Sequence, residues 1–186
     1  MSEFIIRSTA IDGLAIIERQ PAHDDRGFFE RLYCHHDLDQ FLRGKKIRQI
    51  NRSLTKHKGT VRGLHYQHPP YAEDKIITCV KGKVWDVAVD VRRGSPTFLK
   101  HHAITLTDSN HLTYFIPAGF AHGFQALSEE CEMLYLHTAD FNAESSRALN
   151  AVDPALDIDW PTTITKRSMN DSSLEMLTEE FTGVSL

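Results

Sequence analysis

Short strand-forming stretches, separated by turn residues, fill the chain between residues 47 and 136. Turns interrupt their apolar and β-branched runs about every 8–12 residues. The expected strands cover residues 76–80, 84–91, 102–106, 112–116, 123–127 and 133–137. No helical pattern lies between them, which disfavours a parallel α/β sheet because such a sheet needs crossover helices. The pattern therefore predicts an all-β fold, either a sandwich or a small barrel.

The flanks of this region predict two short helices. An apolar face over residues 37–42 indicates the first helix, with Asp37 as its N-cap. Residues 172–181 indicate a second, terminal helix. We find no internal repeat or linker, and 41% hydrophobic residues in 186 are enough for a core. The economical prediction is a single domain over residues 1–186.

Charge and cysteine content narrow the possible partners and the location. The formal net charge is −4, so there is no basic excess to neutralise the phosphates of a nucleic acid. No stretch approaches the roughly 20 apolar residues of a membrane span, and residues 1–7 lack the basic start of a secretory signal. Cys34, Cys79 and Cys131 show no CxxC spacing. Reduced thiols in a cytoplasmic protein fit best.

One histidine and two cations precede the expected strand at residues 84–91. His65 suits a general base because histidine titrates near neutrality. Arg62 lies three residues earlier, so strand alternation alone would place the two side chains on opposite faces. Gly63 between them is a position where the strand can bend and bring them together. Lys75 could stabilise an enolate oxygen or hold a phosphate, although most lysines are simply solvated.

The string PAGFAHGF at residues 117–124 is similar to the second motif of the cupin superfamily, whose members are β jelly rolls. It places His122 just after a tight turn, where binding residues often lie. The first cupin metal motif needs a second histidine two residues after His65, and Gln67 occupies that position. A metal held by His65, His68 and His122 stays open as an alternative.

Tyr135 is a further candidate, because tyrosine can act as an acid where its hydroxyl faces a pocket. On an alternating strand it shares a face with Met133 and His137. The competing interpretation is a core tyrosine whose hydroxyl lies at the rim.

Several strings in sequence order resemble the nucleotide-sugar epimerases typified by dTDP-4-dehydrorhamnose 3,5-epimerase. They are DRGFF (25–29), VRGLHYQ (61–67), VWDVAVD (84–90), RGSPTF (93–98), IPAGFAHGF (116–124) and DIDWP (157–161). The resemblance implies a cupin-type jelly-roll sandwich, usually a homodimer, that needs no metal or organic cofactor. It also implies epimerisation at C3 and C5 of a nucleoside-diphosphate 4-keto-6-deoxy sugar, in the supply of L-rhamnose for surface polysaccharide.

The resemblance assigns roles residue by residue. His65 matches the base, Tyr135 the acid of the opposite face, and Lys75 the lysine beside the enolate oxygen. Asp171 matches the carboxylate that orients the base, with an N-cap of the terminal helix as the alternative. The matching substrate-binding positions are Arg26, Glu30, Gln49, Asn51, Arg62, Lys75, His122 and Phe141.

Departures from the family pattern leave alternatives open. Glu30 directly follows Phe29, and Ser146 and Asn170 stand where relatives often carry Glu and Lys. Thymidine is the family default for the nucleobase and cytidine is the competitor. A single-carbon epimerase is the alternative within the class. A metal-dependent cupin oxygenase and a non-catalytic sugar-nucleotide binding cupin are the alternatives from other classes.

Overall fold

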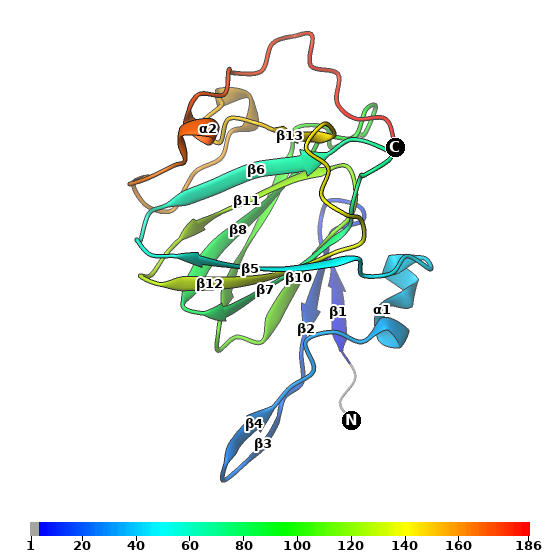
Figure 1. Ribbon diagram of the computed structural model, residues 1–186, viewed down its shortest axis with the longest axis vertical. Coiled ribbons are helices and arrows are strands. Elements are labelled where there is room, and N and C mark those ends of the chain that lie inside the picture. The colour runs from blue at the N-terminus through cyan, green and yellow to red at the C-terminus, as the bar shows by residue number, and fades with distance from the viewer. Residues whose placement is uncertain (1–3) are drawn as a thin grey trace.

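Two antiparallel sheets pack face to face in the computed structural model, which describes residues 4–186 (Figure 1). The first three residues of the segment considered above for a secretory signal lie outside the described residues. The six-stranded sheet has the order β1 (Ile5–Ser8), β2 (Ala15–Glu18), β10 (Leu112–Ile116), β7 (Lys75–Lys81), β12 (Cys131–His137) and β5 (Gln49–Thr55). The five-stranded sheet has the order β13 (Ser146–Ala148), β6 (Val61–Gln67), β11 (Phe120–Ala126), β8 (Lys83–Asp90) and β9 (His101–Thr107). The predicted sandwich is confirmed.

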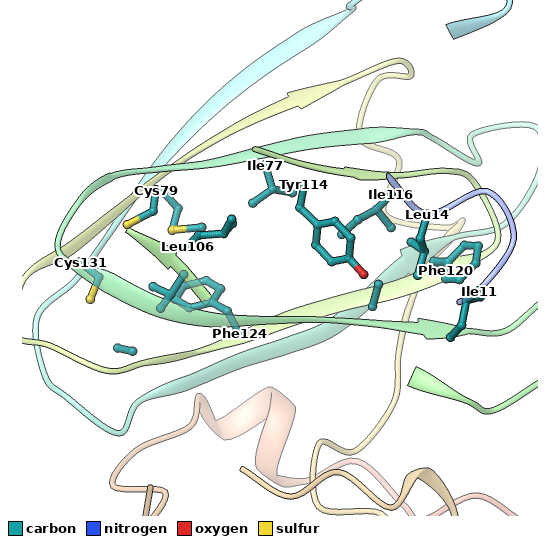
Figure 2. Close-up of a cluster of buried hydrophobic side chains, with 14 residues drawn as sticks. Ile11, Leu14, Ile77, Cys79, Leu106, Tyr114, Ile116, Phe120, Phe124 and Cys131 are labelled. Carbon is teal, nitrogen blue, oxygen red and sulfur yellow. The ribbon is translucent and has the colours of Figure 1, made fainter. Parts of the chain in front are cut away.

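Successive side chains of a strand point to opposite faces of its sheet, so each sheet directs one row of apolar side chains into a shared core (Figure 2). Ile77 on β7 and Tyr114 on β10 point inward from the six-stranded sheet and meet Phe124 from β11. Burying a side chain of this size contributes about 1.5–3 kcal/mol. This cluster fills the interior toward β9 and β10, while the interior toward β5 and β6 stays open.

The outer faces of both sheets are also covered, and this explains the continuous apolar run of β8. Val87, Val89 and Val91 pack under the C-terminal segment, which contributes Leu156 and Val184. On the other side of the molecule, the outer face of the six-stranded sheet lies under α1 (His35–Leu42). A strand buried on both faces loses the polar–apolar alternation of a half-exposed strand.

Both helix predictions need correction in detail. The N-cap of α1 is Cys34, and Asp37 lies in the first turn, so the predicted N-cap is wrong by three positions. The α2 helix spans only Met169–Ser172, and residues 173–181 form turns and irregular chain. A terminal helix over 172–181 is therefore wrong. Leu177 and Phe181 instead pack separately against the sandwich, which an irregular chain allows and a short helix would not.

A short hairpin projects away from the sandwich (Figure 1). It consists of β3 (Ala22–Asp24) and β4 (Gly27–Phe29) and is called the arm below. Phe28 and Phe29 on it are 55% and 74% exposed. A short 3-10 turn, η1 (Pro154–Leu156), completes the elements described. None of the helices in residues 4–186 is long and apolar enough to cross a bilayer.

Candidate active site

A cleft of about 840 Å³ opens between the two sheets beside β5 and β6. Nine of the side chains predicted from the sequence line it. They are Gln49, Asn51, Arg62, His65, Lys75, His122, Tyr135, Phe141 and Asp171. Five different strands, the α2 turn and the loop after β12 contribute these residues. The fold therefore gathers in one cleft residues that lie far apart in the sequence.

His65 and Asp171 form a hydrogen-bonded pair although they are 106 positions apart. His65 Nε2 lies 2.8 Å from Asp171 Oδ1. The His65 side chain is half-exposed in the cleft, while that of Asp171 is 8% exposed. Ser168 is the N-cap of α2 and accepts from the Asp171 backbone N–H, so the N-cap alternative for Asp171 is wrong. With Nε2–H donated to the carboxylate, Nδ1 keeps the lone pair that a base needs.

A β-bulge at Gly63 brings Arg62 and His65 to the same side of β6. His65 lies opposite His122 on β11, whereas Arg62 lies opposite Phe124, so two residues of β6 face one of β11. Gly63 has φ +115°, a region that favours glycine. Both side chains line the cleft. The predicted bend at Gly63 is confirmed.

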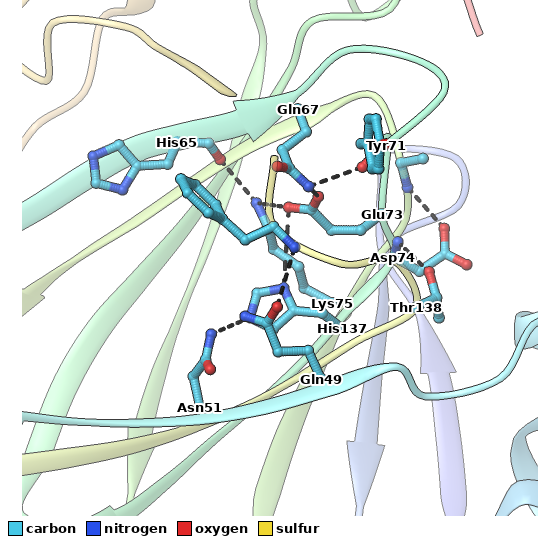
Figure 3. A network of polar contacts seen from close by, with 12 residues as sticks. Gln49, Asn51, His65, Gln67, Tyr71, Glu73, Asp74, Lys75, His137 and Thr138 are labelled. Carbon is cyan, nitrogen blue, oxygen red and sulfur yellow. Dashed lines mark hydrogen bonds and ion pairs between the residues drawn. The ribbon is translucent and has the colours of Figure 1, made fainter. Parts of the chain in front are cut away.

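Lys75 is the centre of a buried polar network (Figure 3). It is only 5% exposed, so the interpretation as a solvated lysine is wrong. Its Nζ donates to the backbone carbonyl of His65 at 2.9 Å and pairs with Glu73 Oε1 at 3.2 Å. Glu73 also accepts from the side-chain amide of Gln67. These contacts hold one ammonium group beside the base, where it can neutralise a developing negative charge.

His137 closes the network on the side of β5. Its ring lies 4.0 Å from Glu73 Oε1 and 3.5 Å from the Asn51 amide nitrogen. Burial, with repulsion from Lys75, lowers the pKa of His137 to about 4. The ring is therefore neutral at physiological pH and adds no second positive charge beside Lys75.

Tyr135 faces His65 from the other sheet, because β12 and β6 form opposite walls of the cleft. Its hydroxyl lies 2.8 Å from Ser53 Oγ. Burial raises the pKa of Tyr135 well above its usual range, so the phenol keeps its proton. A base on one wall and a protonated acid on the other can serve the two faces of a carbon held between them.

His122 is held by a fully buried carboxylate. Its Nε2 lies 2.9 and 3.0 Å from the two oxygens of Asp86. Burial raises the pKa of Asp86, and the contact with His122 opposes that shift. The orientation of the ring in the cleft wall is thereby fixed.

The three histidines of the metal alternative do not form one group, although His65 and His122 are neighbours across β6 and β11. His65 is paired with Asp171, and His122 with Asp86. His68 packs against Tyr66 and does not line the cleft. Over residues 4–186, no group of three or more His, Cys, Asp or Glu side chains is arranged to hold a metal ion.

The outer part of the cleft carries the predicted nucleotide-binding residues. The Gln49 side-chain oxygen accepts from the Phe141 backbone N–H at 3.1 Å. The Phe141 ring is 65% exposed and lines the cleft, as a stacking platform for a base must. Arg62 is exposed nearby.

Two predicted substrate-binding residues lie outside the cleft. Arg26 is at the tip of the arm and pairs with Asp24 at 2.5 Å. Glu30 follows the arm and pairs with Arg19 at 3.1 Å and His111 at 3.0 Å. Within one chain, neither side chain reaches the other site residues.

Sequence reasoning missed several cleft residues. Ser53 carried a usable signal, because Gln49, Asn51 and Ser53 alternate along one strand and must share a face. Glu73 and Arg167 carried none, because each lies outside any regular strand or helix. Contacts with Lys75 and Gln67 place Glu73, and a contact with Asn150 places Arg167.

Comparisons with known proteins agree with this geometry. Residues 8–179 match the family model described as dTDP-4-dehydrorhamnose 3,5-epimerase. A protein of that name from Sinorhizobium fredii is 38% identical over 180 residues, which is 96% of this chain and 92% of the relative.

Solved structures of nucleotide-sugar epimerases have the same fold. A Legionella pneumophila epimerase, in complex with dTDP-4-keto-L-rhamnose, superposes with a TM-score of 0.91 at 34% identity, over 99% of this chain and 100% of that one. A double mutant of a 3'-monoepimerase from Streptomyces bikiniensis, in complex with dTDP, gives a TM-score of 0.84 at 27% identity, over 91% and 85% of the two chains.

Proposed function

The chain belongs to the dTDP-4-dehydrorhamnose 3,5-epimerase family, and from this premise we propose how its own residues perform the reaction. It is an isomerase that inverts C3 and C5 of dTDP-4-dehydro-6-deoxy-D-glucose to give dTDP-4-dehydro-L-rhamnose. The observation that carries the residue assignment is the placement of His65 and Tyr135 on opposite walls of one cleft, with Lys75 held beside His65.

His65 removes the proton in the first step. The 4-ketone acidifies the hydrogens on C3 and C5, and Nδ1 of His65 accepts one of them while the C–H electrons form an enolate. Asp171, 2.8 Å from Nε2, stabilises the imidazolium that results. The enolate charge collects on O4, where the Lys75 ammonium offsets it.

Tyr135 completes the inversion from the opposite wall. Its hydroxyl gives a proton to the carbon on the face away from His65, and the enolate electrons form the new C–H bond. The Ser53 hydroxyl, 2.8 Å away, stabilises the phenolate until a proton from solvent replaces the one lost. The His65 imidazolium releases the abstracted proton to solvent, which restores the base. The same two steps at the second carbon then give the doubly inverted product.

The nucleotide occupies the outer part of the cleft. Arg62 binds the diphosphate, because a guanidinium matches two phosphate oxygens at once. Phe141 stacks on the nucleobase, and Gln49 and Asn51 contact its edge. His122, fixed by Asp86, contacts the sugar.

We also propose a homodimer in which the arm reaches the partner's cleft. Arg26 is assigned to the substrate but lies at the tip of a projecting hairpin with two exposed phenylalanines (Figure 1). A second copy of the chain can supply it. Mixing Arg26→Ala chains with His65→Ala chains tests this, because each mixed dimer then holds one intact site. Recovered activity is expected, and its absence from dimers that do form would contradict the exchange.

The chain functions as one domain, and we propose a cytoplasmic location. Its three cysteines, Cys34, Cys79 and Cys131, are all free thiols, which suits a reducing compartment.

The decisive experiment is NMR of the 4-keto sugar in D2O with pure enzyme. Deuterium should enter C3 and C5 of the dTDP sugar, and His65→Ala should show no incorporation at either carbon. Deuterium at one carbon would instead indicate a single-carbon epimerase. Preference for the CDP sugar would change the nucleobase assignment. If the wild-type enzyme incorporates no deuterium into either sugar, the mechanism is refuted.

A further inference from the structure

The turn that carries Asp171 has little apolar anchorage of its own. The α2 helix is only four residues long, and Met169 at its start is 87% exposed. Asn170 and Ser172 are exposed as well, and Asp171 is the buried residue of this helix. An isolated turn of this length is not stable in water. Polar contacts from elsewhere must therefore determine where the Asp171 carboxylate lies.

The side chain of Asn150 makes contacts on both sides of this turn. It follows β13 and is 3% exposed. Its Nδ2 donates to the backbone carbonyl of Leu174 at 2.6 Å, just after α2. Its Oδ1 accepts from a guanidinium nitrogen of Arg167 at 2.7 Å, just before the Ser168 N-cap. One buried amide thus ties the two ends of α2 to the sandwich.

Arg167 connects this amide to Asp171 itself. A second guanidinium nitrogen of Arg167 donates to the backbone carbonyl of Asp171 at 3.3 Å. Arg167 is half-buried at the edge of the cleft. The guanidinium therefore spans from Asn150 to the residue whose carboxylate holds His65. Because a guanidinium is planar and rigid, its two hydrogen bonds fix the α2 backbone at Asp171 relative to Asn150.

We propose that Asn150 and Arg167 are positioning residues for the reaction, because together they hold the Asp171 carboxylate against His65. The proposal rests on the proposed function for the roles of His65 and Asp171. Neither residue is expected to touch the reacting carbons. Their effect is confined to the distance and angle of one hydrogen bond, which the proton-abstraction step depends on.

A double-mutant cycle with Asn150→Ala and Asp171→Asn tests the proposal. Asn150→Ala should lower kcat for deuterium incorporation about 10- to 100-fold, with KM changed less than about threefold. In the Asp171→Asn background the same substitution should cost less than about twofold, because the carboxylate that it positions is already absent. Full additivity of the two effects would overturn the proposal.

Asp153→Ala is a matched control. Asp153 lies in the same loop, is 4% exposed, and accepts from the Leu177 backbone N–H, so it ties down the same C-terminal segment beyond α2. Its removal should lower Tm but leave kcat within about twofold. An equal loss of kcat in this control would overturn the proposal. If Asn150→Ala does not fold, Arg167→Met takes its place in the cycle. This substitution removes the same connection between Asn150 and Asp171, and it does so at the half-buried Arg167.

A second measurement separates this proposal from the enzymatic one. The His65 ring proton shared with Asp171 gives a downfield NMR signal, assigned by its loss in Asp171→Asn. This signal should broaden or vanish in Asn150→Ala and persist in Asp153→Ala. A signal unchanged in Asn150→Ala would overturn the positioning role. If the wild-type enzyme shows this NMR signal but exchanges no deuterium into the 4-keto sugar, the proposed function is refuted and the positioning role is not.

Discussion

Lys75 donates a 2.9 Å hydrogen bond to the backbone carbonyl of His65, so the cation proposed for the enolate is fixed to the residue proposed as the base. The two side chains come from different sheets, because β7 and β6 lie in opposite walls. A displacement of one wall relative to the other would therefore change the base and the cation together. This contact and the ion pair with the buried Glu73 connect the network of Figure 3 to the proposed catalytic geometry.

Lys75→Met should lose both activity and stability, for different reasons. Activity should fall about 10²- to 10³-fold, because the enolate oxygen loses its stabilising charge. Stability should fall about 3 kcal/mol, because Glu73 is left buried without its cation. Adding Glu73→Gln should restore much of the free energy of unfolding and none of the activity. Urea denaturation and turnover assays check the two parts, and recovery of turnover in the double variant would contradict the role of Lys75.

Tyr135→Phe should separate proton exchange from inversion. His65 still removes the proton, but the opposite face has no acid, so the proton returns to the face it left. Inversion should fall about 10²-fold while deuterium enters with retained configuration at a higher relative rate. NMR coupling constants of the sugar ring distinguish the two products. A rise in KM with an unchanged ratio of exchange to inversion would show that Tyr135 only binds substrate.

His137 should make stability depend on pH. Its pKa is about 4 in the folded protein and about 6.5 when unfolded, so the unfolded chain binds more protons between these values. The stability contributed by the neutral ring is present above pH 6.5 and is lost as the pH falls toward 4. Between pH 7.5 and 5 the wild type should lose about 2 kcal/mol more than His137→Asn. Urea unfolding at both pH values checks this, and equal losses would contradict it.

The sequence predicted the strands well because their signal is local. Alternation and turn residues identify strand 112–116 with its observed bounds. The β11 strand begins at Phe120, three residues before the predicted 123, because the Ala121 and His122 that follow give no strand signal. The terminal helix was misplaced because residues 173–181 are held by separate contacts of Leu177 and Phe181, which no local pattern records.

Single site residues could be predicted from the sequence and the family resemblance, but most contacts between them could not. The pairing of His65 with Asp171 depends on the fold bringing together residues 106 positions apart, and no periodicity encodes it. Asn150 was missed for the same reason, since its partners Arg167 and Leu174 are 17 and 24 residues away. Ser53 is different, because strand alternation from Asn51 alone would have placed it in the cleft.

Gly63→Ala should disrupt the bulge that aligns Arg62 with His65. A Cβ at this position would lie 2.5 Å from Gly123 Cα and 2.6 Å from the His122 carbonyl oxygen, both of them backbone atoms that cannot move independently. The positive φ of +115° adds strain for any residue with a Cβ. The free energy of unfolding should fall by about 3 kcal/mol or more, and β6 should shift relative to β11.

Gly94→Ala separates this geometric effect from backbone strain. Gly94 also has a positive φ, +74°, but a Cβ added there would meet no heavy atom within 4 Å, and the residue is outside the cleft. The substitution should cost only about 1–2 kcal/mol and leave turnover unchanged. Gly63→Ala should be assayed at a temperature where it stays folded. Its turnover should then fall by a much larger factor than the fraction of folded protein does. Wild-type turnover in folded Gly63→Ala would show that turnover does not depend on the bulge that aligns Arg62 with His65.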